Sequence, residues 1–187
     1  VRQSTAGFDS VVQVGEIDGT TDWHEALTNI DTVINLAGRA HVLKETSADP
    51  LSEFRRVNVQ GTQRLAEQMI EHGCRRLIFV STIGVHGDST PIDQPFTEAY
   101  KPAPALPYAV AKWEAEQQLE QLQDRLEIVI VRPPLVYGPN APGNFGRLLR
   151  LIQRGIPLPL GAVQNRRSLV SVQNLCDFLV RCVDHPS

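Results

Sequence analysis

The sequence predicts an α/β fold built on a doubly wound parallel β-sheet with helices on both faces. Short apolar runs alternate along the chain with longer amphipathic segments. The runs 32–36, 76–81 and 128–131 are apolar on both faces, as strands are when helices cover both sides of a parallel sheet. The chain has 187 residues, of which 42% are hydrophobic and 21% charged, which suits a soluble globular domain with a sizeable core.

The first part of the chain is expected to contain three strands and two helices. The expected strands are 11–14, 32–36 and 76–81, and a short helix is expected over 22–30 with Thr21 or Asp22 as its cap. A long helix is expected over 50–72, because Asp49 can cap it, Pro50 suits its first turn and Gly73 can end it.

The second part continues the alternation. It is expected to form helix 106–124, strand 128–131, helix 144–154, strand 168–172 and helix 174–183. Open parallel sheets bind ligands at the carboxyl ends of their strands. The segments that follow the strands, 35–38, 81–87 and 132–143, are therefore where we expect a site.

Composition excludes several classes of function. Lysine and arginine number 18 and aspartate and glutamate 21, so the net charge of −3 disfavours a nucleic-acid partner. No apolar stretch is long enough for a membrane span. The three cysteines and five histidines lack metal-ligand spacing, so no metal site is expected, and we interpret the cysteines as reduced thiols of a cytoplasmic protein.

Asn58 lies on the inward stripe of the expected helix 50–72, seven residues from both Leu51 and Leu65. A buried amide needs partners, because leaving it unpaired costs about 1–3 kcal/mol. It is either a structural amide that ties two strands together or a group that positions water or a side chain at the site. Position alone leaves both interpretations open.

Tyr108 and Lys112 lie one turn apart on the inward face of the expected helix 106–124, so their side chains can meet. An ammonium group beside the phenol would stabilise the phenolate and lower the pKa of Tyr108 from about 10, which would make it a base near neutral pH. Alternatively, the stem of Lys112 packs while its head extends to solvent.

Five segments in order carry a resemblance to a known family. They are 35–38 (NLAG), 57–62 (VNVQGT), 79–87 (FVSTIGVHG), 108–112 (YAVAK) and 132–139 (RPPLVYGP). Together they resemble the extended short-chain dehydrogenase/reductase family, in its NAD-dependent epimerase/dehydratase branch and most closely its UDP-glucose 4-epimerase type.

The resemblance implies a Rossmann-like fold that is incomplete at both ends of this chain. Residues 1–132 would be a partial dinucleotide-binding domain that carries the Tyr/Lys helix, and 133–187 the start of a substrate-binding lobe. None of the 13 glycines forms the family's glycine-rich turn, so the chain is interpreted as an interior portion. Arg2 lies near the position that senses a cofactor 2′-phosphate, which hints at NADP.

The resemblance also implies roles for individual residues. The catalytic residues would be Thr82, Tyr108 and Lys112, with Tyr108 as acid/base and Lys112 depressing its pKa. NAD or NADP would contact Glu16, Ile17, Ala37, Gly38, Asn58, Tyr108, Lys112 and Pro133. The substrate would contact Thr82, His86, Asn144 and Arg167. His86 and Ala111 depart from the family's usual tyrosine and serine.

The implied function is an NAD(P)-dependent nucleotide-sugar epimerase that acts on a UDP-hexose by transient hydride transfer from a sugar hydroxyl carbon. Dehydration is disfavoured, because Ile83 and Gly84 stand where dehydratases carry an Asp-Glu pair. The alternatives are a one-way NAD(P)H-dependent reductase or dehydrogenase of a keto-sugar or small carbonyl, and a non-catalytic dinucleotide-sensing module. A homodimer is expected by analogy of fold, with no nucleic-acid or membrane partner.

Overall fold

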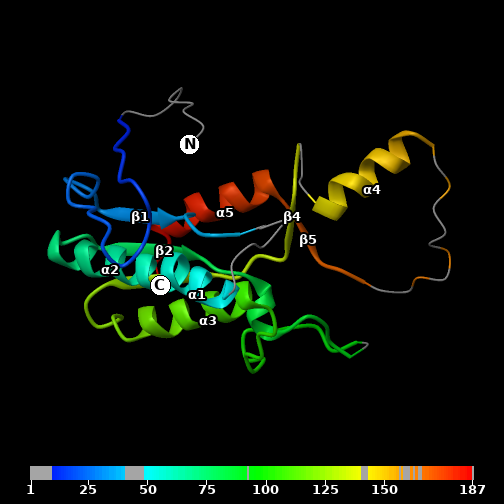
Figure 1. The fold of residues 1–187 in the computed structure, drawn as a ribbon, viewed down its shortest axis with the longest axis horizontal. Helices are drawn as coiled ribbons and strands as arrows, with labels where there is room; N and C mark the ends of the chain where they lie inside the picture. The colour runs from blue at the N-terminus through cyan, green and yellow to red at the C-terminus, as the bar shows by residue number, and fades with distance from the viewer. Residues whose placement is uncertain are drawn as a thin grey trace. The chain divides into compact units, whose positions relative to one another are not determined.

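A computed structural model (Figure 1) describes residues 10–40, 49–91, 93–139, 143–155, 157, 161, 163 and 166–186. The chain divides into two compact units, Val1–Arg132 and Pro133–Ser187, each of which is described by itself. Among the described residues, no helix has both the length and the apolar character needed to cross a bilayer.

The first unit is built on a parallel sheet of three strands, in the order β1 (Thr32–Asn35), β2 (Arg76–Val80) and β3 (Glu127–Val131). Asn35 pairs with Phe79, and Val80 with Val131, so the carboxyl ends of the strands lie at one edge. Helices connect the strands, as parallel pairing requires. The predicted parallel α/β class is confirmed.

The connection from β1 to β2 is helical over its last part. It consists of α1 (Pro50–Arg55), the π-helix η1 (Arg56–Gln60) and α2 (Gly61–Glu71). The carboxylate of Asp49 accepts a hydrogen bond from the Ser52 backbone N–H at 3.1 Å, so the predicted cap is confirmed. Gly73, with φ of +70°, follows α2.

The connection from β2 to β3 contains the 3-10 helix η2 (Ile83–His86) and then α3 (Pro107–Glu120). Pro107 occupies the first position of α3, where its missing N–H has no consequence. Turns follow α3 over 121–125.

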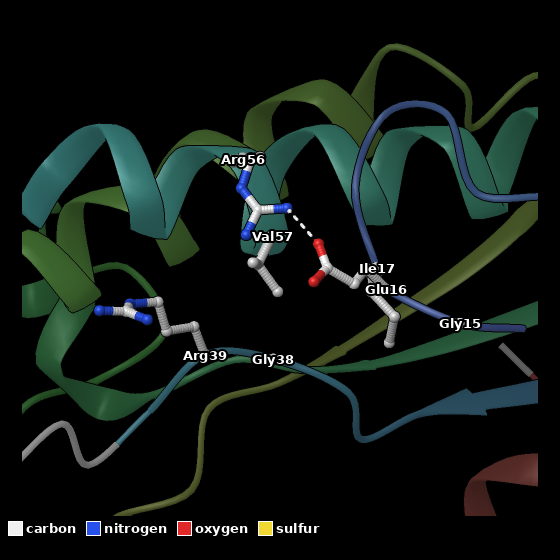
Figure 2. Close-up of a pocket in the computed structure, with 7 residues that line it drawn as sticks. All are labelled: Gly15, Glu16, Ile17, Gly38, Arg39, Arg56 and Val57. Carbon is white, nitrogen blue, oxygen red and sulfur yellow. Dashed lines mark ion pairs between the residues drawn. The ribbon is translucent and has the colours of Figure 1, made fainter.

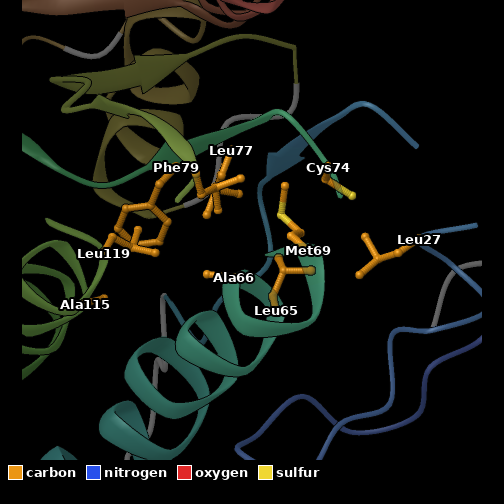
Figure 3. Packing of buried hydrophobic residues seen from close by; sticks show 10 residues of the cluster. Leu27, Leu65, Ala66, Met69, Cys74, Leu77, Phe79, Ala115 and Leu119 are labelled. Carbon is orange, nitrogen blue, oxygen red and sulfur yellow. The ribbon is translucent and has the colours of Figure 1, made fainter. Parts of the chain in front are cut away.

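The core lies between the sheet, α2 and α3 (Figure 3). Leu77 and Phe79 of β2 pack against Met69 of α2 and Leu119 of α3, and all four side chains are fully buried. This packing fixes both helices against the sheet, and so it fixes the ends of the helices that lie near the carboxyl edge of β2.

Three predicted elements of this unit are wrong or altered. Residues 11–14 form no strand, since none of the described strands pairs with them. Residues 24–29 form successive turns instead of a helix; Leu27 N bonds to Trp23 O, but Ile30 N bonds to Leu27 O, so the ladder is not continuous. The long helix 50–72 is interrupted by η1, which inserts a wider turn around Asn58.

The second unit contains β4 (Leu135–Tyr137), α4 (Gly143–Gln153), β5 (Leu169–Ser171) and α5 (Val172–Asp184). β4 and β5 form a parallel pair, with Val136 opposite Val170. The Ser171 hydroxyl caps α5 by accepting from Asn174 N at 3.1 Å. β4 was not expected; β5 and both helices confirm the predicted elements with small shifts at their ends.

Candidate functional site

A cavity of about 330 Å³ lies beside the carboxyl end of β1 (Figure 2). Its size is at the lower end of the range of small-molecule sites. Seven residues line it: Gly15, Glu16, Ile17, Gly38, Arg39, Arg56 and Val57. The lining comes from the segment before Asp18, from the segment after β1 and from the start of η1. Three predicted cofactor residues, Glu16, Ile17 and Gly38, therefore meet at this cavity.

Asn58 fixes the segment that forms the floor of the cavity. Its side chain is 1% exposed, accepts a hydrogen bond from Arg39 N at 2.8 Å and donates one to Arg39 O at 3.1 Å. The amide is therefore structural, but it ties η1 to the segment after β1 and not two strands to each other, as had been expected. Nearby, the Asn35 side chain accepts from Ala37 N at 3.0 Å, so the predicted Ala37–Gly38 stretch is held by two buried amides.

The backbone of Gly38 lies where the side chains of Asn58 and Lys112 converge. A Cβ atom at this position would lie 3.0 Å from Asn58 Oδ1 and 3.6 Å from Lys112 Nζ. Glycine at this position therefore allows the Asn58 amide and the Lys112 ammonium group to approach the backbone closely. The predicted residues Gly38, Asn58 and Lys112, which are far apart in sequence, thus lie together.

Lys112 is 4% exposed, and its ammonium group points at the carboxyl end of β2. It donates a hydrogen bond to Val80 O at 2.8 Å and lies 4.4 Å from the centroid of the Phe79 ring. Burial lowers the pKa of Lys112 from 10.5 to about 8, and the carboxylate of Glu116 partly opposes that shift. The alternative of a head that extends to solvent is therefore wrong.

Tyr108 lies at the start of α3, with its ring 6.0 Å from that of Phe54 in an edge arrangement. Burial raises the pKa of the Tyr108 phenol above its usual value of 10.0. We expected Lys112 to lower it, and that expectation is wrong for this structure. The reason is that the ammonium group is directed to Val80 O, so burial is the influence that remains on the phenol.

Thr82 is the N-cap residue of η2 and lies two residues beyond the end of β2. Its hydroxyl oxygen accepts a hydrogen bond from Gly84 N at 3.1 Å, which caps η2 and leaves the hydroxyl proton available for another acceptor. A methyl group at Gly84 would lie 3.5 Å from Cβ of Ala109, the residue after Tyr108. Thr82 and Tyr108 are thus on adjoining elements.

A buried ionic network adjoins Lys112. Glu116 is 0% exposed, and Arg132 Nε and Nη2 donate to its two carboxylate oxygens at distances of 2.5 to 3.1 Å. Arg132 Nη1 also donates to His86 Nε2 at 3.1 Å and its guanidinium lies 5.8 Å from the centroid of the Trp113 ring.

His86, predicted to contact substrate, is buried in this network. Its ring stacks on Phe96 with centroids 5.5 Å apart and meets Tyr100 edge-on at 6.1 Å. Burial and, to a lesser degree, the charge of Arg132 lower the pKa of His86. The imidazole is thereby kept neutral, as an acceptor from a guanidinium must be.

The remaining predicted residues belong to the second unit or lie outside the described residues. Pro133 is the first residue of the second unit, Asn144 is the second residue of α4, and Arg167 is an exposed residue before β5. Arg2 lies outside the described residues. No group of three metal-ligating side chains able to hold an ion is found within the described ranges.

Sequence reasoning missed several contributors to the site. Arg56 lines the cavity and forms an ion pair with Glu16 at 3.5 Å (Figure 2). It forms a second ion pair with Asp18 at 3.3 Å, and nothing in the local pattern indicates either pair. Glu116, by contrast, could have been found, because it follows Lys112 by one turn on the same inward face.

Comparison with known proteins is consistent across three kinds of match. The model of the "NAD dependent epimerase/dehydratase family" matches residues 3–187. A UDP-glucose 4-epimerase of Vibrio cholerae is 46% identical over 190 residues, which cover 100% of this chain and 58% of that protein. The chain thus spans little more than half the length of this curated relative.

Two solved structures show the same arrangement of elements. MoeE5 in complex with UDP-glucuronic acid and NAD has a TM-score of 0.76 and 28% identity, with 92% of this chain and 58% of that chain covered. DesIV, a dTDP-glucose 4,6-dehydratase from Streptomyces venezuelae with NAD and TYD bound, has a TM-score of 0.74 and 27% identity, with 90% and 53% covered.

Proposed function

The chain belongs to the NAD-dependent epimerase/dehydratase family, and from this membership we propose that the protein which carries it is an NAD(P)-dependent nucleotide-sugar epimerase acting on a UDP-hexose. The observation that carries the proposal is the convergence of Gly38, Asn58 and Lys112 beside a ligand-sized cavity. The similarity to a UDP-glucose 4-epimerase supports the choice of substrate class.

The described residues fit a dinucleotide. The cavity is lined by Gly38, which has no side chain, by the apolar side chain of Ile17 and by the carboxylate of Glu16. These features suit an adenosine, from whose donors the carboxylate can accept hydrogen bonds. Within the first unit, Ala37, Asn58 and Lys112 would continue this surface toward the nicotinamide end. Pro133 is also proposed as a cofactor contact. When bound, the dinucleotide supplies a hydride acceptor.

The residues at the end of β2 would perform the proton chemistry. Tyr108 exchanges a proton with the sugar hydroxyl, and because burial keeps its phenol protonated, it is ready to act as the acid in the direction that reduces a ketone. Lys112 would bind the cofactor, since its ammonium group is directed to Val80 O and the pKa of the phenol is raised by burial. Thr82 would donate its hydroxyl proton in a hydrogen bond to the same sugar hydroxyl.

Further residues are proposed to recognise the substrate. Asn144 and Arg167 would bind the nucleotide diphosphate, since a guanidinium matches the geometry of phosphate oxygens. His86 would border the sugar. Thr82 is followed by Ile83 and Gly84 instead of two carboxylic acids, which favours epimerisation over elimination of water. A homodimer is the proposed assembly.

The proposal is tested with UDP-glucose that carries deuterium at C4 of the glucose, supplied to the full-length protein in ordinary water. An epimerase returns the same hydrogen to the opposite face, so deuterium stays at C4 of the UDP-galactose formed and added NAD(P)H is not consumed. Loss of the label to water would overturn the hydride mechanism. Net consumption of NAD(P)H would indicate the one-way reductase instead.

A further inference from the structure

The network beyond Lys112 contains a carboxylate that the chemistry proposed above does not use. Glu116 is an ionisable side chain with no exposed surface, one helical turn from Lys112. Burying a carboxylate is costly unless a cation pairs with it. Arg132 provides that cation: its Nε donates to Oε1 at 3.1 Å and its Nη2 donates to Oε2 at 2.5 Å.

The environment of Lys112 supplies a hydrogen bond and little compensating charge. From β2 the carbonyl of Val80 and the ring of Phe79 face the ammonium group, and from the segment after β1 the backbone of Gly38 faces it. These groups are uncharged. On α3 itself, Tyr108 is protonated below its raised pKa. Among the described residues, Glu116 is the negative charge that acts on this cation.

Arg132 is itself held in place, so the position of the carboxylate is defined. It directly follows β3, its guanidinium lies over the Trp113 ring, and it donates to neutral His86. Because Val131 pairs with Val80, Arg132 extends from the strand next to the one whose carbonyl receives the Lys112 ammonium. The carboxyl end of the sheet thereby positions the Lys112 ammonium group through Val80 O and the Glu116 carboxylate through Arg132.

We propose that Glu116 is a positioning residue for Lys112: its buried carboxylate, fixed by Arg132, keeps the ammonium group charged and directed at the carboxyl end of β2. The proposal rests on the function proposed above only for the consequence in catalysis. The electrostatic link itself is a property of the chain. Without Glu116, no carboxylate among the residues that the structure describes would oppose the cost of burying the Lys112 charge, and the proton would be lost at lower pH.

The test measures the titration of Lys112 directly. The chain has three lysines, Lys44, Lys101 and Lys112, so labelling lysine with carbon-13 at Cε gives three NMR signals, and Lys112→Arg identifies the relevant one. In the wild type, the signal should titrate near pH 8. In Glu116→Gln, which keeps the shape of the side chain, the midpoint should fall by about one pH unit, a tenfold change in the protonation ratio.

The matched control is Glu120→Gln, which removes the same charge from an exposed position on α3 and should leave the midpoint unchanged. Glu116→Asp keeps the charge and should keep the midpoint near that of the wild type; a fall as large as the one expected for Glu116→Gln would show that the charge is not what acts on Lys112, and would overturn the proposal. A midpoint in Glu116→Gln at or above that of the wild type would overturn it too, because a purely structural role for Glu116 predicts no downward movement.

A second readout separates this inference from the proposed function. In the full-length protein, the alkaline limb of the pH profile of kcat/KM should move downward in Glu116→Gln together with the NMR midpoint. If the midpoint moves and the profile does not, the role of Glu116 stands and the catalytic role proposed for Lys112 fails.

Discussion

Replacing Lys112 by methionine should make the free energy of unfolding less dependent on pH between pH 7 and pH 10. The structure lowers the pKa of Lys112 from 10.5 to about 8 through burial, so the folded state binds this proton less tightly than the unfolded state does. At about 1.4 kcal/mol per pKa unit, the charged ammonium group destabilises the fold by about 3 kcal/mol at pH 7.

The sign of the pH dependence follows from this difference. Below pH 8 both states carry the proton and the full cost is present. Between pH 8 and 10.5 the folded state has released the proton while the unfolded state still holds it, so stability rises with pH through this window. Methionine removes this dependence, whereas all other titrating groups stay common to both proteins.

The assay is urea denaturation of the wild type and of Lys112→Met at pH 7 and at pH 10. The gain in unfolding free energy between the two pH values should be larger in the wild type by about 2 kcal/mol. Comparing gains cancels the lost hydrogen bond to Val80 O, which is the same at both pH values. Lys101→Met, from an exposed position, should behave like the wild type. Equal gains in the wild type and Lys112→Met would refute the burial of a charged ammonium group at this site.

Three further variants probe the cavity and the phenol. Gly61→Ala places a Cβ atom 2.6 Å from Cγ2 of Ile17, so the free energy of unfolding should fall by about 1–3 kcal/mol and NAD should bind more weakly; unchanged urea denaturation would contradict the close approach. Asn58→Ala removes two hydrogen bonds to Arg39 and should cost about 1–3 kcal/mol by the same assay, whereas loss of under half a kilocalorie would show that the amide does not hold the segment. In an ultraviolet titration, Tyr108→Phe should remove a phenol that ionises above pH 10, and removal of a phenol that ionises below pH 10 would reverse the assigned direction.

The sheet could be predicted because its strands are short, apolar on both faces and separated by amphipathic helices. Residues 11–14 show the limit of that reasoning: their apolar pattern suits a strand, but a strand exists only where another backbone pairs with it, and no described strand does. The π-helix around Asn58 could likewise not be predicted from the spacing of apolar residues. One wider turn barely changes the spacing of apolar residues, yet it determines where the amide points.

The sequence predicts which side chains belong to the site better than it predicts their contacts and pKa shifts. Glu16, Ile17 and Gly38, which were predicted to contact the cofactor, line the cavity, whereas Arg56 joins them through tertiary contacts that no local motif reveals. The predicted direction of the Tyr108 pKa shift was wrong for a related reason. Residues one turn apart can meet, but Lys112 finds a carbonyl on the neighbouring strand instead, and only the packed structure shows that choice.

The most direct test of the central claim is the rate at which the full-length protein converts UDP-glucose to UDP-galactose with and without the phenolic oxygen of Tyr108. Proton transfer by a positioned side chain contributes about 100- to 10,000-fold. The account predicts that Tyr108→Phe lowers kcat by at least about 100-fold while the urea denaturation curve stays close to that of the wild type. Interconversion at the wild-type rate by Tyr108→Phe would contradict it.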